Sequence, residues 1–425
     1  MKFLWFHLMP YPDLPDDFKE THPSVWVDID PHLFDPARGH AVYHEYMDEL
    51  EFAANAGFDA ICVNEHHSNA YGLMPSPNLI ASTLARNTTD TALCVMGNSL
   101  ALYNPPTRVA EEMAMIDCIS GGRMIAGFPL GTPMDTCYAY GQNPALLRAR
   151  YMEAVDLVTR AWEEEEPFAF NGRFNQQRYV NVWPRPVQKP RPPVWVPGSG
   201  SVETWQMCAE RNFLYAYLSY FGWQASAGVM KGFWNHMKEA GKEPNPFNAG
   251  FLQFVGVAEN RKEAEKLYAG PADYFYNRCL HLGPMYANPP GYTSEASLRA
   301  KLGSQVTAAA NQGAGSGISG PARDFSNTKF FDEGHVIIGS PDEVADKLRE
   351  VAIELNVGNV LLLLHFGNMS RELTNYNTQL FAEKVMPQVR DLFEDEWENP
   401  WWPQPMPQSQ RVDRSKTTAQ MVAAQ

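Results

Sequence analysis

The feature that most constrains the fold is an alternation of short apolar runs with longer segments of helical periodicity, repeated along most of the chain. Eight runs have the length of β-strands, and each is continuously apolar, as is typical of parallel strands covered on both faces. We therefore predict an α/β protein, and eight repeats favour a closed TIM (β/α)8 barrel over an open sheet. The predicted strands are Lys2–Leu8, Phe58–Asn64, Ala92–Asn98, Arg123–Phe128, Pro193–Pro197, Phe213–Leu218, Gly250–Val257 and Asn359–His365.

Two helix boundaries are marked by their flanking residues. The prolines of Asn104-Pro105-Pro106 precede a helix predicted from Thr107 to Cys118, which Gly121-Gly122 closes. Ser340-Pro341-Asp342-Glu343 has a cap residue, a proline at the first helical position and two acids in the first turn, and therefore predicts the start of another helix.

Domain organisation follows from length and from two unusual segments. The 425 residues are 44% hydrophobic, so we expect one large domain over residues 1–398. About a hundred residues separate the last two predicted strands, which predicts a long insertion at about 283–331. We expect this insertion to act as a mobile cover, and protease cleavage to occur between Gly313 and Asn327 in the ligand-free protein. Residues 399–425 are rich in Pro, Gln and Ser and predict a flexible C-terminal tail.

Charge and composition exclude several classes of partner. The net charge of −15 repels phosphate backbones, so no nucleic acid is expected. Six scattered cysteines without a C-x-x-C pair argue against a zinc site and a disulfide framework, and indicate a reducing compartment. No run reaches the ~18 apolar residues of a membrane span, and the N-terminus does not have the form of a signal peptide, so we expect a cytoplasmic protein without membrane contact.

The first candidate site is Asn64-Glu65-His66-His67, directly after the second predicted strand. In a barrel of this kind, chemistry is carried by the loops at the carboxyl ends of the strands. Adjacent histidines there offer a proton donor or acceptor near neutral pH, although histidines at strand ends often only satisfy backbone groups. The pair His40 and His44 has helical spacing, but it has no third metal ligand nearby in sequence, so a solvated helix face is the better explanation and no metal site is predicted.

The second candidate is Val196-Pro197-Gly198-Ser199-Gly200-Ser201, where the fifth predicted strand gives way to a helix. Small residues at a helix N-terminus let backbone N–H groups approach a phosphate, and the helix dipole adds to the attraction. The spacing is neither that of a dinucleotide fingerprint nor that of a P-loop, and a plain strand-to-helix turn capped by Ser201 stays possible. The glycines of Gly127-Phe128-Pro129-Leu130-Gly131 indicate only that the backbone after the fourth strand needs room.

These motifs together resemble the bacterial luciferase-like family of flavin-dependent monooxygenases, in consistent order from about Met1 to Phe393. No single piece is specific, but the combination is. The motifs that carry the resemblance are Gly57-Phe58-Asp59-Ala60 to Glu65-His66-His67, Pro75-Ser76-Pro77, Asn98 through Pro105-Pro106-Thr107-Arg108-Val109-Ala110-Glu111-Glu112 to Asp117, Ser120-Gly121-Gly122-Arg123, the Gly/Ser turn after Trp195, and Gly339-Ser340-Pro341-Asp342-Glu343-Val344 to Phe381.

The resemblance implies a barrel that uses reduced FMN and O2, with the reduced flavin supplied by a separate flavin reductase, and a protein that forms homo-oligomers. It places a catalytic histidine beside the flavin at His66, with His67 next to it and expected to matter less. It also implies a non-prolyl cis peptide under the flavin ring, which falls at Gly97-Asn98.

The phosphate contacts implied by the resemblance fall on Gly200 and Ser201, with Ser199 nearby, and Tyr151 is the candidate for a tyrosine near the phosphate. The chain departs from the family at Leu130, where many members have an arginine near the phosphate. Either another cation contacts the phosphate, with Arg150 as the candidate, or phosphate recognition is weaker than in those members.

Aromatic residues crowd the predicted strand ends, and they indicate a small, largely apolar substrate, although aromatic side chains there can be mere packing. The set comprises Trp5, Phe6, Tyr71, Tyr103, Phe128, Tyr138, Tyr217, Tyr220, Phe221 and Trp223. Two rival functions stay open: a deazaflavin-dependent oxidoreductase with the same fold, and a flavin-binding protein without turnover.

Overall fold

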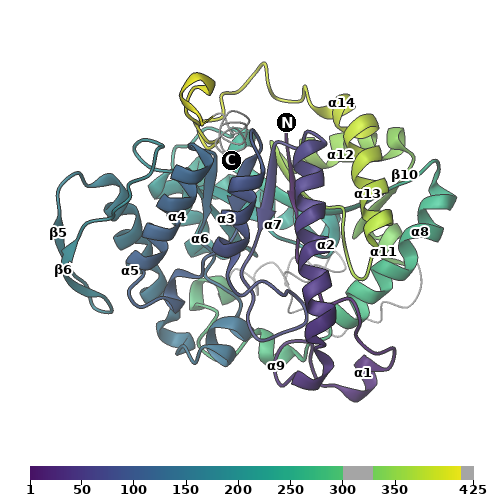
Figure 1. Ribbon diagram of the computed structural model, residues 1–425, viewed down its shortest axis with the longest axis horizontal. Helices are drawn as coiled ribbons and strands as arrows, with labels where there is room; N and C mark the ends of the chain where they lie inside the picture. Colours follow the sequence, from purple (N-terminus) through teal and green to yellow (C-terminus); the bar gives the residue numbers. More distant parts are fainter. Residues whose placement is uncertain (300–328, 413–425) are drawn as a thin grey trace, which may run out of the picture.

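The computed structural model, which describes residues 1–299 and 329–412, is a parallel barrel surrounded by helices (Figure 1). The strand order is β10-β9-β11-β1-β2-β3-β4-β7-β8, and an additional pairing of β9 with β8 closes the sheet. The eight strands of the closed barrel are β1 (Lys2–Phe6), β2 (Ala60–Val63), β3 (Ala92–Val95), β4 (Met124–Gly127), β7 (Val194–Gly198), β8 (Leu214–Tyr217), β9 (Ala249–Val257) and β11 (Asn359–Leu363). The predicted TIM barrel is confirmed, with strands that end between three residues before and one residue after the expected positions.

Helices cover the outside of the barrel between successive strands (Figure 1). They are α2 (Pro36–Asn55), α3 (Pro77–Asn87), α4 (Thr107–Ser120), α5 (Pro144–Glu163), α6 (Val202–Arg211), α7 (Gly222–Glu239), α8 (Arg261–Tyr274), α12 (Pro341–Leu355) and α13 (Arg371–Leu380), with the short α1 (Phe18–Thr21), α9 (Pro284–Ala287), α11 (Lys329–Asp332) and α14 (Met386–Val389). Both predicted helix boundaries are confirmed, because Gly121 ends α4 at φ +70° and Ser340 with Glu343 forms a capping box on α12. Within the described ranges, no helix combines the length and apolarity needed to cross a bilayer.

Alternate residues of each strand build two apolar layers. In β1, Leu4 and Phe6 belong to the cluster inside the barrel, whereas Phe3 and Trp5 pack outward against the helices. Both layers are buried, since all four side chains are at most 1% exposed. This is the reason why the barrel strands are apolar at almost every residue, with exceptions such as Gln253 and Asn359.

Three strands lie outside the predicted set. The antiparallel pair β5 (Phe168–Asn171) and β6 (Gln176–Val180) forms a hairpin that projects from one side of the barrel (Figure 1). β10 (Val336–Gly339) pairs in parallel with the second half of β9, beyond the point where β8 ends.

The long connection between β9 and β11 lies partly outside the described residues. Its described part includes α8, α9 and the following residues 288–299, then α11, β10 and α12. The predicted cleavage region from Gly313 to Asn327 lies outside the described residues, and the insertion limits of about 283–331 stay a prediction.

Residues 399–412 pack on the barrel instead of forming the free tail that we expected, whereas residues 413–425 lie outside the described part of the chain. The indole Nε1 of Trp401 donates to the carbonyl of Asn212, and the Trp401 carbonyl accepts from Trp195 Nε1 at 3.0 Å. Trp401 is only 8% exposed, so this part of the segment is held by burial of its indole as well as by these hydrogen bonds.

Candidate functional site

A cleft lies at the carboxyl ends of the strands, with about 1400 Å³ of empty space that includes open solvent. Its walls come from the loops after β1, β2, β3, β4, β7 and β8 and from the first turns of α5 and α6. Residues 287–297, which we call the roof segment, contribute the remaining wall from the connection that follows β9. The cleft lies where enzymes with this fold place their chemistry.

His66 borders this cleft, with 12% of its side chain exposed, and is held by a buried acid. Its Nδ1 lies 2.9 Å from Asp135 Oδ2. The ring is also enclosed edge-on by the aromatic rings of Trp26 and Tyr71, at centroid distances of 5.3 and 4.8 Å. The histidine is therefore fixed in orientation, with the rest of its ring next to the cleft.

Asp135 accepts hydrogen bonds at both carboxylate oxygens. Oδ1 accepts from the backbone N–H of His67 and from Trp26 Nε1, and Oδ2 accepts from the Thr132 hydroxyl at 2.8 Å. Burial raises the pKa of Asp135, but the charge and hydrogen bond of His66 and these donors lower it below its ordinary value. Asp135 is therefore a carboxylate near neutral pH, and the proton between the two side chains lies on Nδ1 of His66.

Asp135 is not part of any local sequence motif, because its partner His66 is far away in the chain. It lies in a π-helical turn, Met134–Ala139, that follows β4, whereas His66 follows β2. An acid in the loop after β4 is not by itself a signal, because nothing near it in the sequence marks it as the partner of a histidine. A π-helical turn at such a place is itself frequent at functional sites.

His67 points away from the cleft. Its Nε2 lies 2.7 Å from Glu65 Oε1, and its ring packs on Tyr140 at a centroid distance of 4.3 Å. Glu65 Oε2 also accepts from the hydroxyl of Tyr103 at 2.9 Å. Of the two adjacent histidines, only His66 lines the cleft.

Gly97 and Asn98 lie under the cleft without lining it. Asn98 is fully buried, and its backbone N–H donates to the carbonyl of Gly127. The expected non-prolyl cis peptide between them is wrong, because every cis bond of the described residues precedes a proline. The trans bond keeps Asn98 hydrogen-bonded to the end of β4, and a cis bond without proline is costly by ~3 kcal/mol.

The predicted phosphate turn lines the cleft with all three of its small residues, Ser199, Gly200 and Ser201. Gly200 has φ +100°, and a Cβ atom there would lie 3.0 Å from Val229. Only glycine fits this conformation without strain. The helix α6 begins directly after the turn, so its positive end points at the same space.

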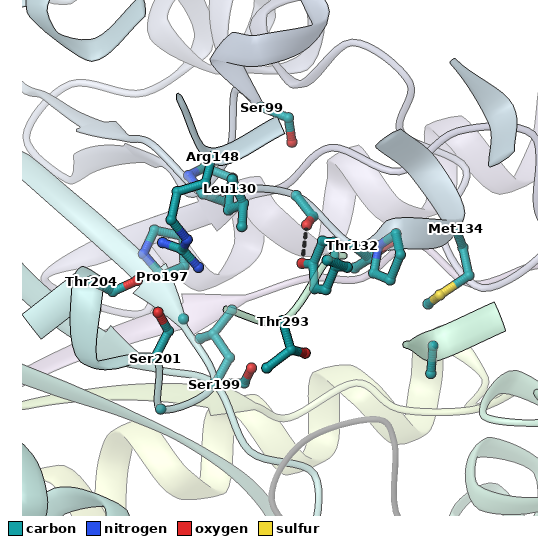
Figure 2. A pocket seen from close by; sticks show the side chains of 18 of the residues that line it. Ser99, Leu130, Thr132, Met134, Arg148, Pro197, Ser199, Ser201, Thr204 and Thr293 are labelled. Atoms are coloured by element: carbon teal, nitrogen blue, oxygen red, sulfur yellow. Dashed lines mark hydrogen bonds between the residues drawn. The ribbon is translucent and has the colours of Figure 1, made fainter. Parts of the chain in front are cut away.

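Arg148 is the cation of this cleft, and no local sequence motif signals it. Figure 2 shows its side chain reaching from α5 toward Pro197, Ser201 and Thr204. Its Nε is buried without a hydrogen-bond partner among the described residues. Such an unsatisfied cationic group beside a glycine turn fits the phosphate of a flavin mononucleotide.

The two phosphate candidates on α5 lie elsewhere. Arg150 stacks over the ring of Phe174 at 5.1 Å and does not line the cleft. Tyr151 is 1% exposed, and its hydroxyl donates to the Phe128 carbonyl at 2.6 Å, which stabilises the end of β4. The helical phase explains the position of Arg150, which lies two residues from Arg148 and therefore on another face of α5. Tyr151 shares the face of Arg148, but its hydroxyl is already used by the Phe128 carbonyl.

Apolar side chains form the inner part of the cleft: Phe6, Met96, Leu130, Met134, Leu218 and Tyr220. Of the ten aromatic residues that we expected at the mouth, Phe6 and Tyr220 line it. The others pack mainly in the core, such as Trp5 and Phe128 at 0% exposure, or lie at the surface, such as Tyr138 at 43%. Fewer aromatic residues at the strand ends therefore line the cleft than the sequence pattern predicted.

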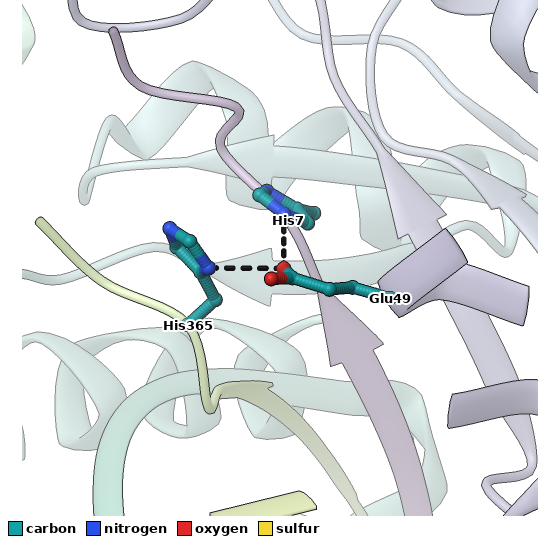
Figure 3. A group of neighbouring side chains, drawn as sticks. All are labelled: His7, Glu49 and His365. Carbon is teal, nitrogen blue, oxygen red and sulfur yellow. Dashed lines mark hydrogen bonds and ion pairs between the residues drawn. The ribbon is translucent and has the colours of Figure 1, made fainter. Parts of the chain in front are cut away.

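A second polar cluster, His7, Glu49 and His365, brings together side chains of metal-binding type (Figure 3). Glu49 Oε2 lies 3.1 Å from His7 Nε2 and 2.9 Å from His365 Nδ1. The backbone N–H of Met9 donates to His7 Nδ1, so the ring proton is on Nε2 and faces Glu49. A metal-binding histidine normally donates a proton from its other ring nitrogen, so hydrogen bonding explains this cluster better than a metal ion does.

The sequence profile of the luciferase-like monooxygenase family matches residues 27–357. The 4-hydroxyprotoasukamycin monooxygenase of Streptomyces nodosus subsp. asukaensis is 24% identical over 80% of this chain and 85% of that protein. The oxygenase component of the flavin-dependent trigonelline monooxygenase of Acinetobacter baylyi is 29% identical, over 36% of this chain and 43% of that protein.

A solved structure shows the same fold. The oxygenating constituent of 3,6-diketocamphane monooxygenase of Pseudomonas putida, a type II Baeyer-Villiger monooxygenase in complex with FMN, has a TM-score of 0.67 and 18% identity and covers 91% of this chain and 98% of that chain. Since the family profile spans more than half of the sequence, the chain belongs to the luciferase-like monooxygenase family.

Proposed function

We propose that the protein is the oxygenase component of a two-component system that uses reduced FMN and O2 to oxygenate a small, largely apolar organic substrate. The observation that carries the proposal is one cleft that contains both the His66–Asp135 pair and the turn Ser199–Ser201 with Arg148. A separate reductase would supply the reduced flavin, as the name of the Acinetobacter baylyi oxygenase component suggests for that enzyme.

The proposed cofactor would be held by its phosphate. Gly200 and Ser201 with their backbone N–H groups, Thr204 with its hydroxyl on the first turn of α6 and Arg148 with its guanidinium line the same space and would donate to the phosphate there. Three neutral donors and one cation match a phosphate group. Reduced flavin, when bound, would supply the electrons that activate oxygen.

His66 would handle the proton of the reaction. Asp135 holds the proton on Nδ1, which leaves Nε2 able to accept or, once protonated, to donate a proton beside the bound flavin. Phe6, Met96, Met134 and Leu218 would bind an apolar substrate, while the roof segment limits access of water.

The test is an oxygen-transfer assay. The purified protein is supplied with chemically reduced FMN, oxygen enriched in oxygen-18, and a panel of small cyclic ketones and alkenes, and products are analysed by mass spectrometry. We expect labelled product from the wild-type protein and none above background from His66→Ala. Label in no product, together with equal hydrogen peroxide yields from both proteins, would favour the flavin-binding protein without turnover.

A parallel arm replaces FMN with the reduced deazaflavin coenzyme. A substrate oxidised or reduced without oxygen in this arm would favour the deazaflavin-dependent oxidoreductase.

A further inference from the structure

One acid lies directly beside the phosphate turn. Glu203, in the first turn of α6, accepts hydrogen bonds from three serine hydroxyls. Its Oε2 accepts from Ser201 at 2.7 Å and from Ser297 at 2.8 Å, and its Oε1 accepts from Ser294. Ser201 belongs to the turn, whereas Ser294 and Ser297 belong to the roof segment.

All three serines line the cleft, and Ser297 is only 4% exposed. Partial burial raises the pKa of Glu203, but the hydroxyls of Ser294, Ser201 and Ser297 and its own backbone N–H lower it to about 2. Glu203 is therefore ionised at any physiological pH. The three hydroxyls form an anion-binding arrangement that the protein fills with its own carboxylate.

A phosphate bound at the turn would compete with this carboxylate. An oxygen that accepts from Ser201 Oγ lies about 3 Å from it, and Glu203 Oε2 lies 2.7 Å from the same hydroxyl. The two anions would then be less than about 6 Å apart at a partly buried site, where like charges repel more strongly than in water. Ser201 cannot donate its single proton to both.

We propose that Glu203 weakens the binding of FMN by competing with its phosphate for these serines, and thereby keeps the flavin exchangeable. This inference rests on the proposed function, in which the phosphate lies at Ser199–Ser201. An enzyme that receives reduced flavin from a separate reductase must release the oxidised form after each turnover, and a built-in competing anion serves that release. Glu203 also couples phosphate binding to the roof segment, because the carboxylate that competes for Ser201 also accepts hydrogen bonds from Ser294 and Ser297 of that segment.

The experiment measures dissociation constants of FMN and riboflavin for Glu203→Gln, because riboflavin lacks the phosphate. Glutamine keeps the shape of the side chain and removes its charge, so we expect FMN to bind about ten-fold more tightly while riboflavin changes less than about two-fold. The matched control is Glu210→Gln on the exposed side of the same helix, where the acid accepts from Gln206; it should leave both constants unchanged.

An unchanged or weakened FMN affinity in Glu203→Gln, with riboflavin unaffected, overturns this inference. Glu203→Asp is the second variant, because it keeps the charge but withdraws it from the serines, and we expect an intermediate FMN affinity. Should the wild-type protein bind FMN no better than riboflavin, the phosphate site of the proposed function fails instead. The wild-type protein could prefer FMN over riboflavin, with a preference that Arg148→Met abolishes but Glu203→Gln leaves unchanged. This result would contradict the role of Glu203 and leave the phosphate site in place.

Discussion

At the scale of single residues, the His66–Asp135 pair is the part of the site that performs chemistry in the proposed function. His66→Ala should leave the barrel folded and flavin bound, but lower the yield of oxygenated product per reduced FMN by a factor of about 10² to 10⁴. Asp135→Asn should lower it too, because an amide does not hold the proton on Nδ1 in the same way. Product yields close to wild type in His66→Ala would remove His66 from the mechanism.

Arg148 gives a second residue-scale prediction, with a control two positions along the same helix. Arg148→Met should weaken FMN binding by about ten-fold or more, because it removes the cation of the phosphate site, and should change riboflavin binding little. Arg150→Met removes an equal charge over Phe174, away from the cleft, and should change neither constant. Titration of each variant with both ligands checks this, and equal losses from the two variants would mean a general electrostatic effect.

The residues that the sequence predicted share one property: each lies in a motif that is local in the chain. His66 and the turn Ser199–Ser201 could be found because adjacent residue types signal them. Asp135 and Arg148 could not, because their roles depend on contacts with loops about 50 to 70 residues away. A glycine substitution in the turn is a poorer test than Arg148→Met, since Gly200 at φ +100° would be strained by any side chain.

At the scale of elements, continuous apolar runs identified the eight barrel strands but not the remaining three. In β5 the side chains alternate between half-buried and exposed, and in β6 most of them are exposed, so this hairpin has no continuous apolar run. β10 is fully buried and apolar, but among the described strands it pairs with β9 alone, and a count of eight already filled the expected barrel. Whether such a segment forms a strand depends on the strand that it pairs with, and local sequence patterns do not reveal that partner.

The buried cluster of His7, Glu49 and His365 lies where α2 meets the ends of β1 and β11. It predicts that the free energy of unfolding depends on pH. Burial lowers the pKa of His7 to about 4, and its neighbours Glu49, His365 and Tyr46 enclose it. The unfolded chain takes up this proton near pH 6.5, so stability present above that pH is lost as the pH falls from about 6.5 to about 4, by up to about 3 kcal/mol.

Urea unfolding between pH 7 and pH 4 measures this loss. His7→Gln should lose less stability over the interval than the wild-type protein does, whereas His40→Gln, at an exposed position of α2, should follow the wild-type curve. Parallel curves for the wild type and His7→Gln would show that other groups cause the pH dependence.

At the scale of the whole molecule, the two ends of the barrel have separate tasks. The carboxyl ends of the strands hold the cleft, and residues 399–412 cover the amino ends (Figure 1). Trp401→Ala should lower the free energy of unfolding by about 3 kcal/mol, because a buried indole and its hydrogen bond to the Asn212 carbonyl are lost, and should leave FMN affinity unchanged.

Trp183→Ala is the control for this prediction, since that indole is 81% exposed and its loss should change stability by less than about 0.5 kcal/mol. Equal shifts of the thermal midpoint in both variants would contradict a structural role for the C-terminal segment.

The central claim is that the cleft is a site for reduced FMN, and an anaerobic binding titration tests it most directly. The purified protein is titrated with reduced FMN, reduced riboflavin and the reduced deazaflavin coenzyme, and binding is followed by flavin absorbance or fluorescence. We predict one site per chain that binds reduced FMN at least about ten-fold more tightly than either alternative, because in the proposed function the turn Ser199–Ser201 and Arg148 would contact its phosphate. Tighter binding of the deazaflavin, or no preference for FMN over riboflavin, would contradict the account.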